Sequence, residues 1–161
     1  MSEINIITEE INMDELVQAL KRVLANEYAF SLKAQNFHWN VEGPDFPQYH
    51  DFFGNFYEEV YNNTIDRTAE LIRQLDSYTP GSILRYAELS QIQDQTKIPR
   101  AMLMMEELYQ DNAIILEMYK QAFHVAEEAD EQGICDFIAG RIDAHAKHQW
   151  MLRSILKTAR A

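Results

Sequence analysis

Four residues whose side chains bind first-row metals lie in two short stretches of the sequence. His38 and His50 are twelve residues apart in NFHWNVEGPDFPQYHDFF, and Asp66 and Glu70 follow in IDRTAEL. Imidazole nitrogen and carboxylate oxygen together form a ligand set suited to iron and other divalent first-row metals. These four residues are therefore the candidate metal ligands, and they are the candidate catalytic residues if the metal undergoes redox chemistry.

The spacing of these residues limits how they can meet. Asp66 and Glu70 are one turn apart on one face of a helix. His50 and Asp66 lie on that same helix at a separation of roughly 24 Å, given about 1.5 Å of rise per residue. Ligands of one metal ion lie much closer together than that. If all four serve one site, the histidines come from one chain and the carboxylates from another, across a two-fold axis.

The elements that must position these residues follow from hydrophobic periodicity. Apolar residues recur at alternating four- and three-residue steps over 13–40 and over 101–129, which predicts two long helices. Further helices are predicted from Pro47 to Asp76 and over 134–158, with a turn through Asp130 and Gly133 before the last one. The connection 82–100 contains one short predicted helix at 83–89. The pattern predicts an all-α four-helix bundle with a long crossover connection, as in ferritin-like proteins.

Composition narrows the class of protein. The 161 residues carry 14 basic and 26 acidic side chains, a formal net charge of -12, so a basic nucleic-acid surface is not expected. We expect an acidic N-terminal tail over 1–12 and a single domain over 13–161. The single Cys135 excludes an internal disulfide framework and a cysteine-based zinc site. The chain begins without a signal-peptide pattern and has no apolar run of membrane-spanning length, which predicts a cytoplasmic protein.

The most familiar iron site of such bundles is absent from the sequence. That site uses Glu-x-x-His motifs on two helices of one subunit. The residues three positions before the five histidines are Gln35, Pro47, Gln121, Ile142 and His145. An iron site in this chain must therefore be built in another way.

Three segments resemble the Dps family of mini-ferritins. They are NFHWNVEGPDFPQYHDFF, the Asp66-Arg67-x-x-Glu70 segment and RIDAHAKHQWMLRS, and the similarity extends over nearly the whole chain. The resemblance implies a hollow twelve-subunit shell that oxidises Fe(II), preferably with hydrogen peroxide, and stores Fe(III). It also implies a ferroxidase centre between two-fold-related subunits, with His38 and His50 from one and Asp66 and Glu70 from its neighbour.

The sequence departs from the family pattern in two places. Gly54 stands where the family usually has Asp or Glu, one turn after the second histidine. The interval from His50 to Asp66 is one residue longer than usual, which predicts a π-bulge in this helix. Another oxygen ligand would come from Asp51, Glu58 or Glu59, and the sequence does not choose among them.

A second polar group lies at predicted inward positions of the last helix. Arg141, His145 and His148 are interpreted as a buried or interface cluster that pairs with Glu27 or Asn112, in preference to a second metal site. The acidic residues before and within the last helix have two interpretations, a solvated turn or, by the resemblance, the lining of a three-fold pore that attracts Fe(II). They are Glu127, Glu128, Asp130, Glu131 and Asp136.

These features favour an iron-oxidising storage shell over two alternatives. The first alternative is a DNA-compacting cage with weak or vestigial ferroxidase activity, which Gly54 slightly favours. Against it, the first twenty residues contain no Lys or Arg, and Arg153, Lys157 and Arg160 are too few to offset the negative charge, so we expect weak or no DNA binding. The second alternative is a ligand-binding bundle without metal, for which the sequence has no pocket signature.

Overall fold

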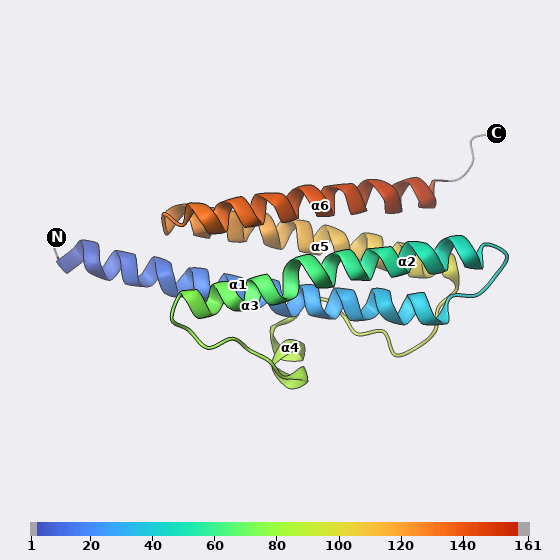
Figure 1. Cartoon of the computed structure of the whole chain (residues 1–161), viewed down its shortest axis with the longest axis horizontal. Helices are drawn as coiled ribbons and strands as arrows, with labels where there is room; N and C mark the ends of the chain where they lie inside the picture. Colours follow the sequence, from blue (N-terminus) through green and yellow to red (C-terminus); the bar gives the residue numbers. More distant parts are fainter. Residues whose placement is uncertain (1–2, 158–161) are drawn as a thin grey trace.

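The fold is all-helical over residues 3–157, the part of the chain that the computed structural model describes (Figure 1). In chain order the helices are α1 (Glu3–Asn40), α2 (Phe46–Val60), the π-helical turn η1 (Tyr61–Ile65), α3 (Asp66–Gln74), α4 (Ile83–Leu89), α5 (Ala101–Glu128) and α6 (Gln132–Leu156). The predicted all-α class is confirmed, as are the short helix at 83–89 and the start of α5 at Ala101.

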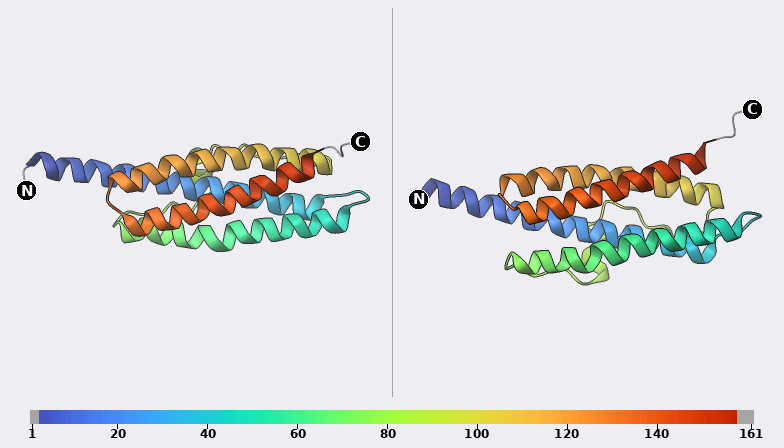
Figure 2. Two further views of the ribbon diagram at one scale, coloured as in Figure 1. Left: turned by 90° about the horizontal axis from the view of Figure 1, so that it is seen from above. Right: turned by 45° about the horizontal axis from the view of Figure 1, so that its top comes forward.

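Four long rods lie side by side: α1, the continuous α2–η1–α3 helix, α5 and α6 (Figures 1 and 2). The α2–α3 rod and α5 run in the same direction, so the chain between them must return along the bundle. That return is the segment containing α4. The predicted four-helix bundle with one long crossover is therefore confirmed.

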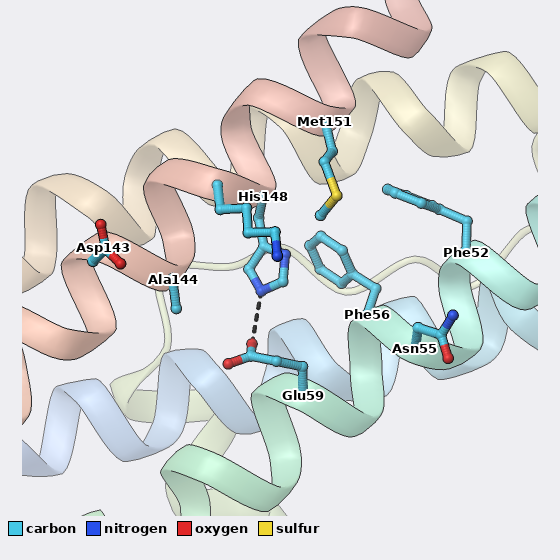
Figure 3. A pocket seen from close by; sticks show the side chains of 9 residues that line it. Phe52, Asn55, Phe56, Glu59, Asp143, Ala144, His148 and Met151 are labelled. Carbon is cyan, nitrogen blue, oxygen red and sulfur yellow. Dashed lines mark hydrogen bonds and ion pairs between the residues drawn. The ribbon is translucent and has the colours of Figure 1, made fainter.

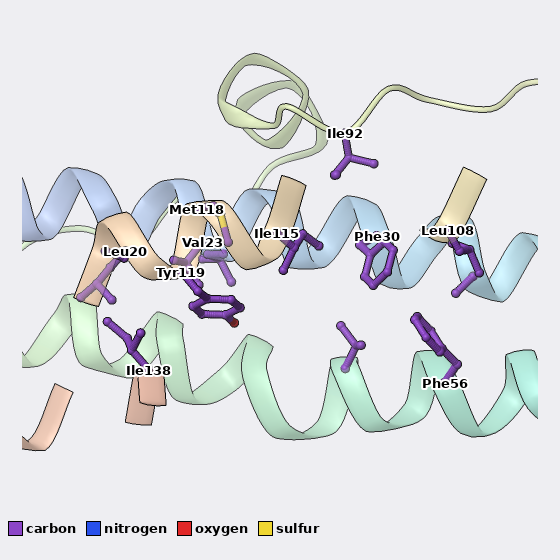
Figure 4. Close-up of a cluster of buried hydrophobic side chains, with 14 of the residues drawn as sticks. Leu20, Val23, Phe30, Phe56, Ile92, Leu108, Ile115, Met118, Tyr119 and Ile138 are labelled. Atoms are coloured by element: carbon purple, nitrogen blue, oxygen red, sulfur yellow. The ribbon is translucent and has the colours of Figure 1, made fainter. Parts of the chain in front are cut away.

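The core between the rods is built from the apolar stripe of each helix. Figure 4 shows Phe30 of α1, Phe56 of α2, Ile115 of α5 and Ile138 of α6 at successive places along the space between the helices, and all four are essentially buried. Full burial of side chains of this size stabilises a fold by about 1.5–3 kcal/mol each relative to exposure. This packing fixes the rotation of each helix and therefore the direction of every polar side chain discussed below.

The ends of α1 and α6 differ from the predicted boundaries. Helix α1 begins at Glu3 rather than at residue 13, because no Gly or Pro interrupts residues 3–12. This first part of α1 projects beyond the other rods (Figure 1), and Ile7 and Ile11 on it are exposed. Residues 1 and 2 of the predicted acidic tail, and the predicted helix end at residue 158, lie outside the described residues.

The turn between α5 and α6 does not use Gly133 as predicted. The residue in the left-handed region is Asp130, with φ of 58°, and α6 begins at Gln132, so Gly133 belongs to its first turn. Aspartate tolerates this backbone conformation better than most residues. The prediction of a tight turn near Asp130 is confirmed, whereas the role given to Gly133 was wrong.

The extra residue between His50 and Asp66 is absorbed as the sequence predicted. Residues 61–65 form a π-helical turn, and the backbone stays right-handed helical through Val60 and Asp66 on either side. At about 100° per residue, sixteen regular steps would place Asp66 about 160° around the helix from His50, whereas the bulge reduces this angle to about 60°. The π turn therefore returns the carboxylates to the side of the helix that carries His50.

Candidate metal centre

His38 and His50 form a reciprocal pair at one end of the bundle. His38 lies in the last turn of α1 and His50 in the first part of α2, and their rings stack with centroids 3.9 Å apart and planes 19° apart. The Nδ1 atom of each ring lies 2.7 Å from the backbone carbonyl oxygen of the other residue. The pair holds the end of α1 against the beginning of α2.

These two hydrogen bonds determine where the imidazole protons lie. A carbonyl oxygen can only accept, so each Nδ1 carries a hydrogen and donates it. In the neutral ring, each Nε2 then keeps a lone pair for a metal. A backbone carbonyl on the second nitrogen is a common way to orient a metal-binding histidine and fix its tautomer. Both rings are half-buried, so they are fixed in direction but reachable.

Gly54 is part of this arrangement. A Cβ atom on Gly54 would lie 2.9 Å from Cε1 and 3.0 Å from Nδ1 of the His38 ring. Real Cβ contacts are not this short, so any side chain at position 54 would displace the ring. The family carboxylate is therefore absent at the position where a side chain would displace the His38 ring.

The two carboxylates are not near the histidine pair within one chain. Asp66 and Glu70 are exposed on α3, at the other end of the long α2–α3 rod (Figure 1), and neither forms a hydrogen bond or ion pair with another described residue. Within residues 3–157, no group of three or more His, Cys, Asp or Glu side chains is placed to hold a metal. The structure thus brings His38 and His50 together and leaves Asp66 and Glu70 apart from them, and the sharing of one site between two chains stays a prediction.

The structure narrows the choice of a further oxygen ligand. Glu59 accepts hydrogen bonds from Arg141 and from His148 Nε2, the latter at 2.7 Å, on the inward side of α2. Burial acts to raise the pKa of Glu59, but hydrogen bonds from His148 and Arg141 hold it far below its usual range. Glu59 is therefore already paired within the chain, which disfavours it as the further ligand. Asp51 and Glu58 remain exposed.

The polar residues of the bundle interior form a closed network. His145 Nε2 lies 2.7 Å from Glu27 Oε1, which also accepts a 2.6 Å hydrogen bond from Tyr119. Asn112 donates to the carbonyl of His145 and to Gln149, so its Oδ1 faces His145 Nδ1 at 2.7 Å and accepts from it. Both ring nitrogens of His145 therefore act as donors, and the ring forms a buried ion pair with Glu27.

The charges in this network support that reading. Burial acts to raise the pKa of Glu27, but the positive His145 and Arg141 bring it below its ordinary value. The interpretation of His145 and His148 as a paired polar cluster is confirmed, since their partners are Glu27, Asn112 and Glu59. The sequence predicted Glu27 or Asn112 as partners, whereas Glu59 was not predicted as the partner of His148.

A groove of about 500 Å³ between α2 and α6 exposes the edge of this network. Figure 3 shows Glu59 of α2 reaching His148 of α6 beside Phe52, Phe56 and Met151. The aromatic and thioether side chains make its floor largely apolar, and the Glu59 carboxylate is occupied by its partners. This groove does not offer a second set of metal ligands.

Comparison with known proteins identifies the family. The ferritin-like domain family matches residues 17–161 of the chain. The DNA protection during starvation protein 2 of Bacillus anthracis is 30% identical over 142 residues, which cover 88% of this chain and 97% of that protein. The chain belongs to the Dps family of ferritin-like proteins.

Solved Dps structures share the fold of this Dps chain. Dps from Staphylococcus aureus superimposes with a TM-score of 0.87 at 30% identity and covers 91% of this chain and 97% of its own. Dps from Vibrio cholerae, described as a member of a broad superfamily of ferritin-like diiron-carboxylate proteins, has a TM-score of 0.87 at 27% identity, covering 91% and 92%. These relatives support a role in iron storage or in DNA protection.

A further relative extends the match to the N-terminal part of this Dps chain. An uncharacterized low temperature-induced protein of Nostoc sp. is 31% identical over 161 residues, covering 98% of this chain and 88% of that protein.

None of the helices within residues 3–157 combines the length and the apolar character that a membrane crossing needs.

Proposed function

We propose that this Dps protein is a ferroxidase that oxidises Fe(II) at a site shared by two chains and stores Fe(III) in a hollow shell of subunits. The observation that carries the proposal is the reciprocal His38–His50 pair, which directs its hydrogen-bonded Nδ1 atoms to carbonyls and leaves both Nε2 atoms for a metal. Family membership supports iron as that metal.

The proposed site uses residues of one chain and carboxylates of a second copy. His38 and His50 bind Fe(II) through Nε2, and the partner's Asp66 and the partner's Glu70 supply negative oxygen ligands. Carboxylates stabilise Fe(III) more than Fe(II), so they favour oxidation of the bound ion. Two Fe(II) ions give one electron each to hydrogen peroxide, which takes up two protons and leaves as two water molecules. Dioxygen is the alternative oxidant.

An antiparallel pairing of two α2–α3 rods gives this site a definite register. If His50 faces the partner's Asp66, positions that sum to 116 lie opposite each other, and Glu58 lies opposite its own copy. Glu58 is then about 12 Å along the helix from His50, since eight residues rise about 1.5 Å each. Asp51 is next to His50 and exposed, so Asp51 is the better candidate for a further oxygen ligand.

Exposed apolar side chains on α1 and α4 support a pairing of two copies. Trp39 of α1 is 62% exposed and Ile83 of α4 is 87% exposed, and Leu32 and Leu84 add further exposed apolar surface on the same two helices. Helix α4 is fixed to α1 by a stacked contact between Tyr28 and Tyr86. Exposed apolar side chains of this size are typical of an interface, and a second copy would bury them.

The shell and its entrances follow from the family resemblance. We expect a dodecamer, with Fe(II) drawn in by the acidic turn between α5 and α6, where Glu127, Glu128 and Asp130 are exposed. Ferric product would then collect on inner-surface carboxylates.

A DNA-compacting cage is the second candidate, because several relatives are named for DNA protection during starvation. The acidic start of α1 argues against it, since Glu3, Glu9 and Glu10 are exposed there.

Iron oxidation distinguishes the two candidates. Fe(II) oxidation is followed aerobically and with peroxide for the wild type and for a variant with His50→Ala and Asp66→Ala. A ferroxidase predicts fast oxidation that the double substitution reduces to the rate of free Fe(II), whereas a structural cage predicts equal rates. In a parallel gel-shift assay at about 150 mM salt we expect no tight DNA complex with metal-free protein, and a tight shift would favour the second candidate.

A further inference from the structure

A series of tyrosines leads from the histidine pair across the face formed by α1, η1 and α4. The Tyr57 ring lies 5.6 Å from the His38 ring, between centroids. Tyr57 and Tyr61 are one turn apart, and together with Tyr28 they line a cavity of about 330 Å³. The Tyr28 ring lies 6.2 Å from that of Tyr61 and is stacked on that of Tyr86 at 4.6 Å.

Every ring in this series beyond the histidines is a tyrosine. The core beneath α1 and α2 uses phenylalanine instead, in the pairs Phe30–Phe56 and Phe37–Phe53. Packing alone is served by either residue, since both bury large aromatic area. Tyrosine differs in chemistry, because its phenol can give up one electron together with its proton and a phenyl ring cannot.

Complete reduction of hydrogen peroxide requires two electrons, so a second electron donor beside a single iron would have a function. Hydrogen peroxide accepts two electrons, whereas one Fe(II) ion gives only one. A site that holds a single Fe(II) ion would leave peroxide half reduced, with release of hydroxyl radical. A second donor in contact with the ligands avoids that outcome.

We propose that Tyr57, Tyr61, Tyr28 and Tyr86 form an electron relay that supplies the second electron to peroxide at the iron site. The inference rests on the proposed ferroxidase function. When a single Fe(II) ion occupies the site, that ion gives one electron and becomes Fe(III), while Tyr57 gives one electron and its phenolic proton. Peroxide takes both electrons, that proton and one proton from solvent, its O–O bond breaks, and it leaves as two water molecules.

The oxidised Tyr57 then regains an electron and a proton from the next tyrosine. The radical thereby moves from ring to ring along the series. Burial and the neighbouring Tyr28 and Tyr61 raise the pKa of Tyr86, so its phenol keeps its proton until it is oxidised. We expect the unpaired electron to come to rest on Tyr86 of α4, because it is the last ring of the series and is stacked on Tyr28.

The test is freeze-quench electron paramagnetic resonance on the assembled protein. The protein is loaded with about one Fe(II) per proposed site and mixed with peroxide, and the tyrosyl radical is quantified in wild type, Tyr57→Phe and Tyr86→Phe. Each substitution keeps the ring and its packing. Tyr78→Phe is the matched control, because Tyr78 is 85% exposed and its ring contacts Arg73 outside the series.

We expect a tyrosyl signal in wild type and in Tyr78→Phe, and a loss of about fivefold or more in Tyr57→Phe together with more trapped hydroxyl radical. Tyr86→Phe keeps a signal but changes its hyperfine splitting, because the radical rests on another ring. Equal signals in all four proteins would overturn the relay. Normal iron oxidation without any tyrosyl signal overturns the relay alone, whereas no iron oxidation by wild type overturns the proposed function and the relay with it.

Discussion

The imidazoles of His38 and His50 are prepared for a metal by groups that a sequence pattern does not display. Two backbone carbonyls fix the tautomers, and the bare Cα of Gly54 makes room for one ring. The sequence was sufficient to predict His38 and His50 as candidate ligands, from their residue type and spacing. The tautomers and the contact with Gly54 could not, because they depend on how closely α1 and α2 approach each other.

Substitutions at two helical glycines test this packing. Gly140→Ala adds a Cβ into open space in α6, so we expect a gain of about 0.5–1 kcal/mol in the free energy of unfolding from helix propensity. Gly54→Ala has the same propensity gain but presses on the His38 ring, at a cost of about 1–3 kcal/mol for overpacking. Urea unfolding should rank Gly140→Ala above Gly54→Ala, and only Gly54→Ala should slow iron oxidation. Equal effects of the two would show that the ring moves freely.

The Glu59–Arg141–His148 cluster makes stability depend on pH. The pKa of Glu59 is lowered by folding, so its contribution is present above its ordinary value of 4.5 and is lost as the pH falls below it. Burial lowers the pKa of His148, so below its ordinary value of 6.5 the unfolded chain binds more protons than the folded one. Both groups predict that stability falls on acidification, beginning near pH 6.5.

A comparison of Glu59→Gln with Glu58→Gln tests whether Glu59 causes this acid sensitivity. Glu59→Gln removes charge-assisted hydrogen bonds from Arg141 and His148, so we expect a loss of about 1.5–3 kcal/mol at neutral pH and a weaker decline below pH 4.5. Glu58→Gln, one residue away and exposed, should change the free energy of unfolding by less than about 0.5 kcal/mol. Urea unfolding at several pH values measures both. An unchanged pH profile in Glu59→Gln would contradict the assignment.

At the scale of helices, the long α2–α3 rod depends on its π turn. The sequence predicted that an extra residue would be absorbed between His50 and Asp66, but the site of the bulge at 61–65 could not be derived. Helix periodicity predicted α5 well, because a buried apolar stripe defines it, whereas the short α4 was predicted within the connection and buries no residue. It missed residues 3–12 of α1, where residues 5–11 are exposed and so turn no apolar stripe toward the core.

Changes in the length of the rod test the function of the π turn. Deletion of the exposed Asn62 should convert the bulge into regular helix, keep Asp66 on the side of His50 and preserve most of the iron oxidation rate. Insertion of one Ala after Val60 should rotate Asp66 by about 100° and reduce the rate about tenfold or more. The two variants change the chain by one residue each and so control for each other. Similar rates in both would show that register along this helix does not matter.

At the scale of the whole molecule, the account depends on contacts between copies. Periodicity and breakers were sufficient to predict the bundle, and helix rise was sufficient to separate His50 from Asp66. The pairing of Glu59 could not be predicted from the sequence, because its partners Arg141 and His148 are more than eighty residues away along the chain. A second chain that buries the exposed apolar side chains on α1 and α4 would also supply the carboxylates that complete the site.

Complementation between two inactive variants tests this central claim most directly. His50→Ala and Asp66→Ala are each expected to oxidise Fe(II) at the rate of the free ion. When the two are co-assembled in equal amounts, half of the two-fold pairs are mixed, and one of the two sites in each mixed pair has every ligand intact. The account therefore predicts recovery of about a quarter of the wild-type rate. No recovery in shells shown to contain both variants would contradict a site shared between chains.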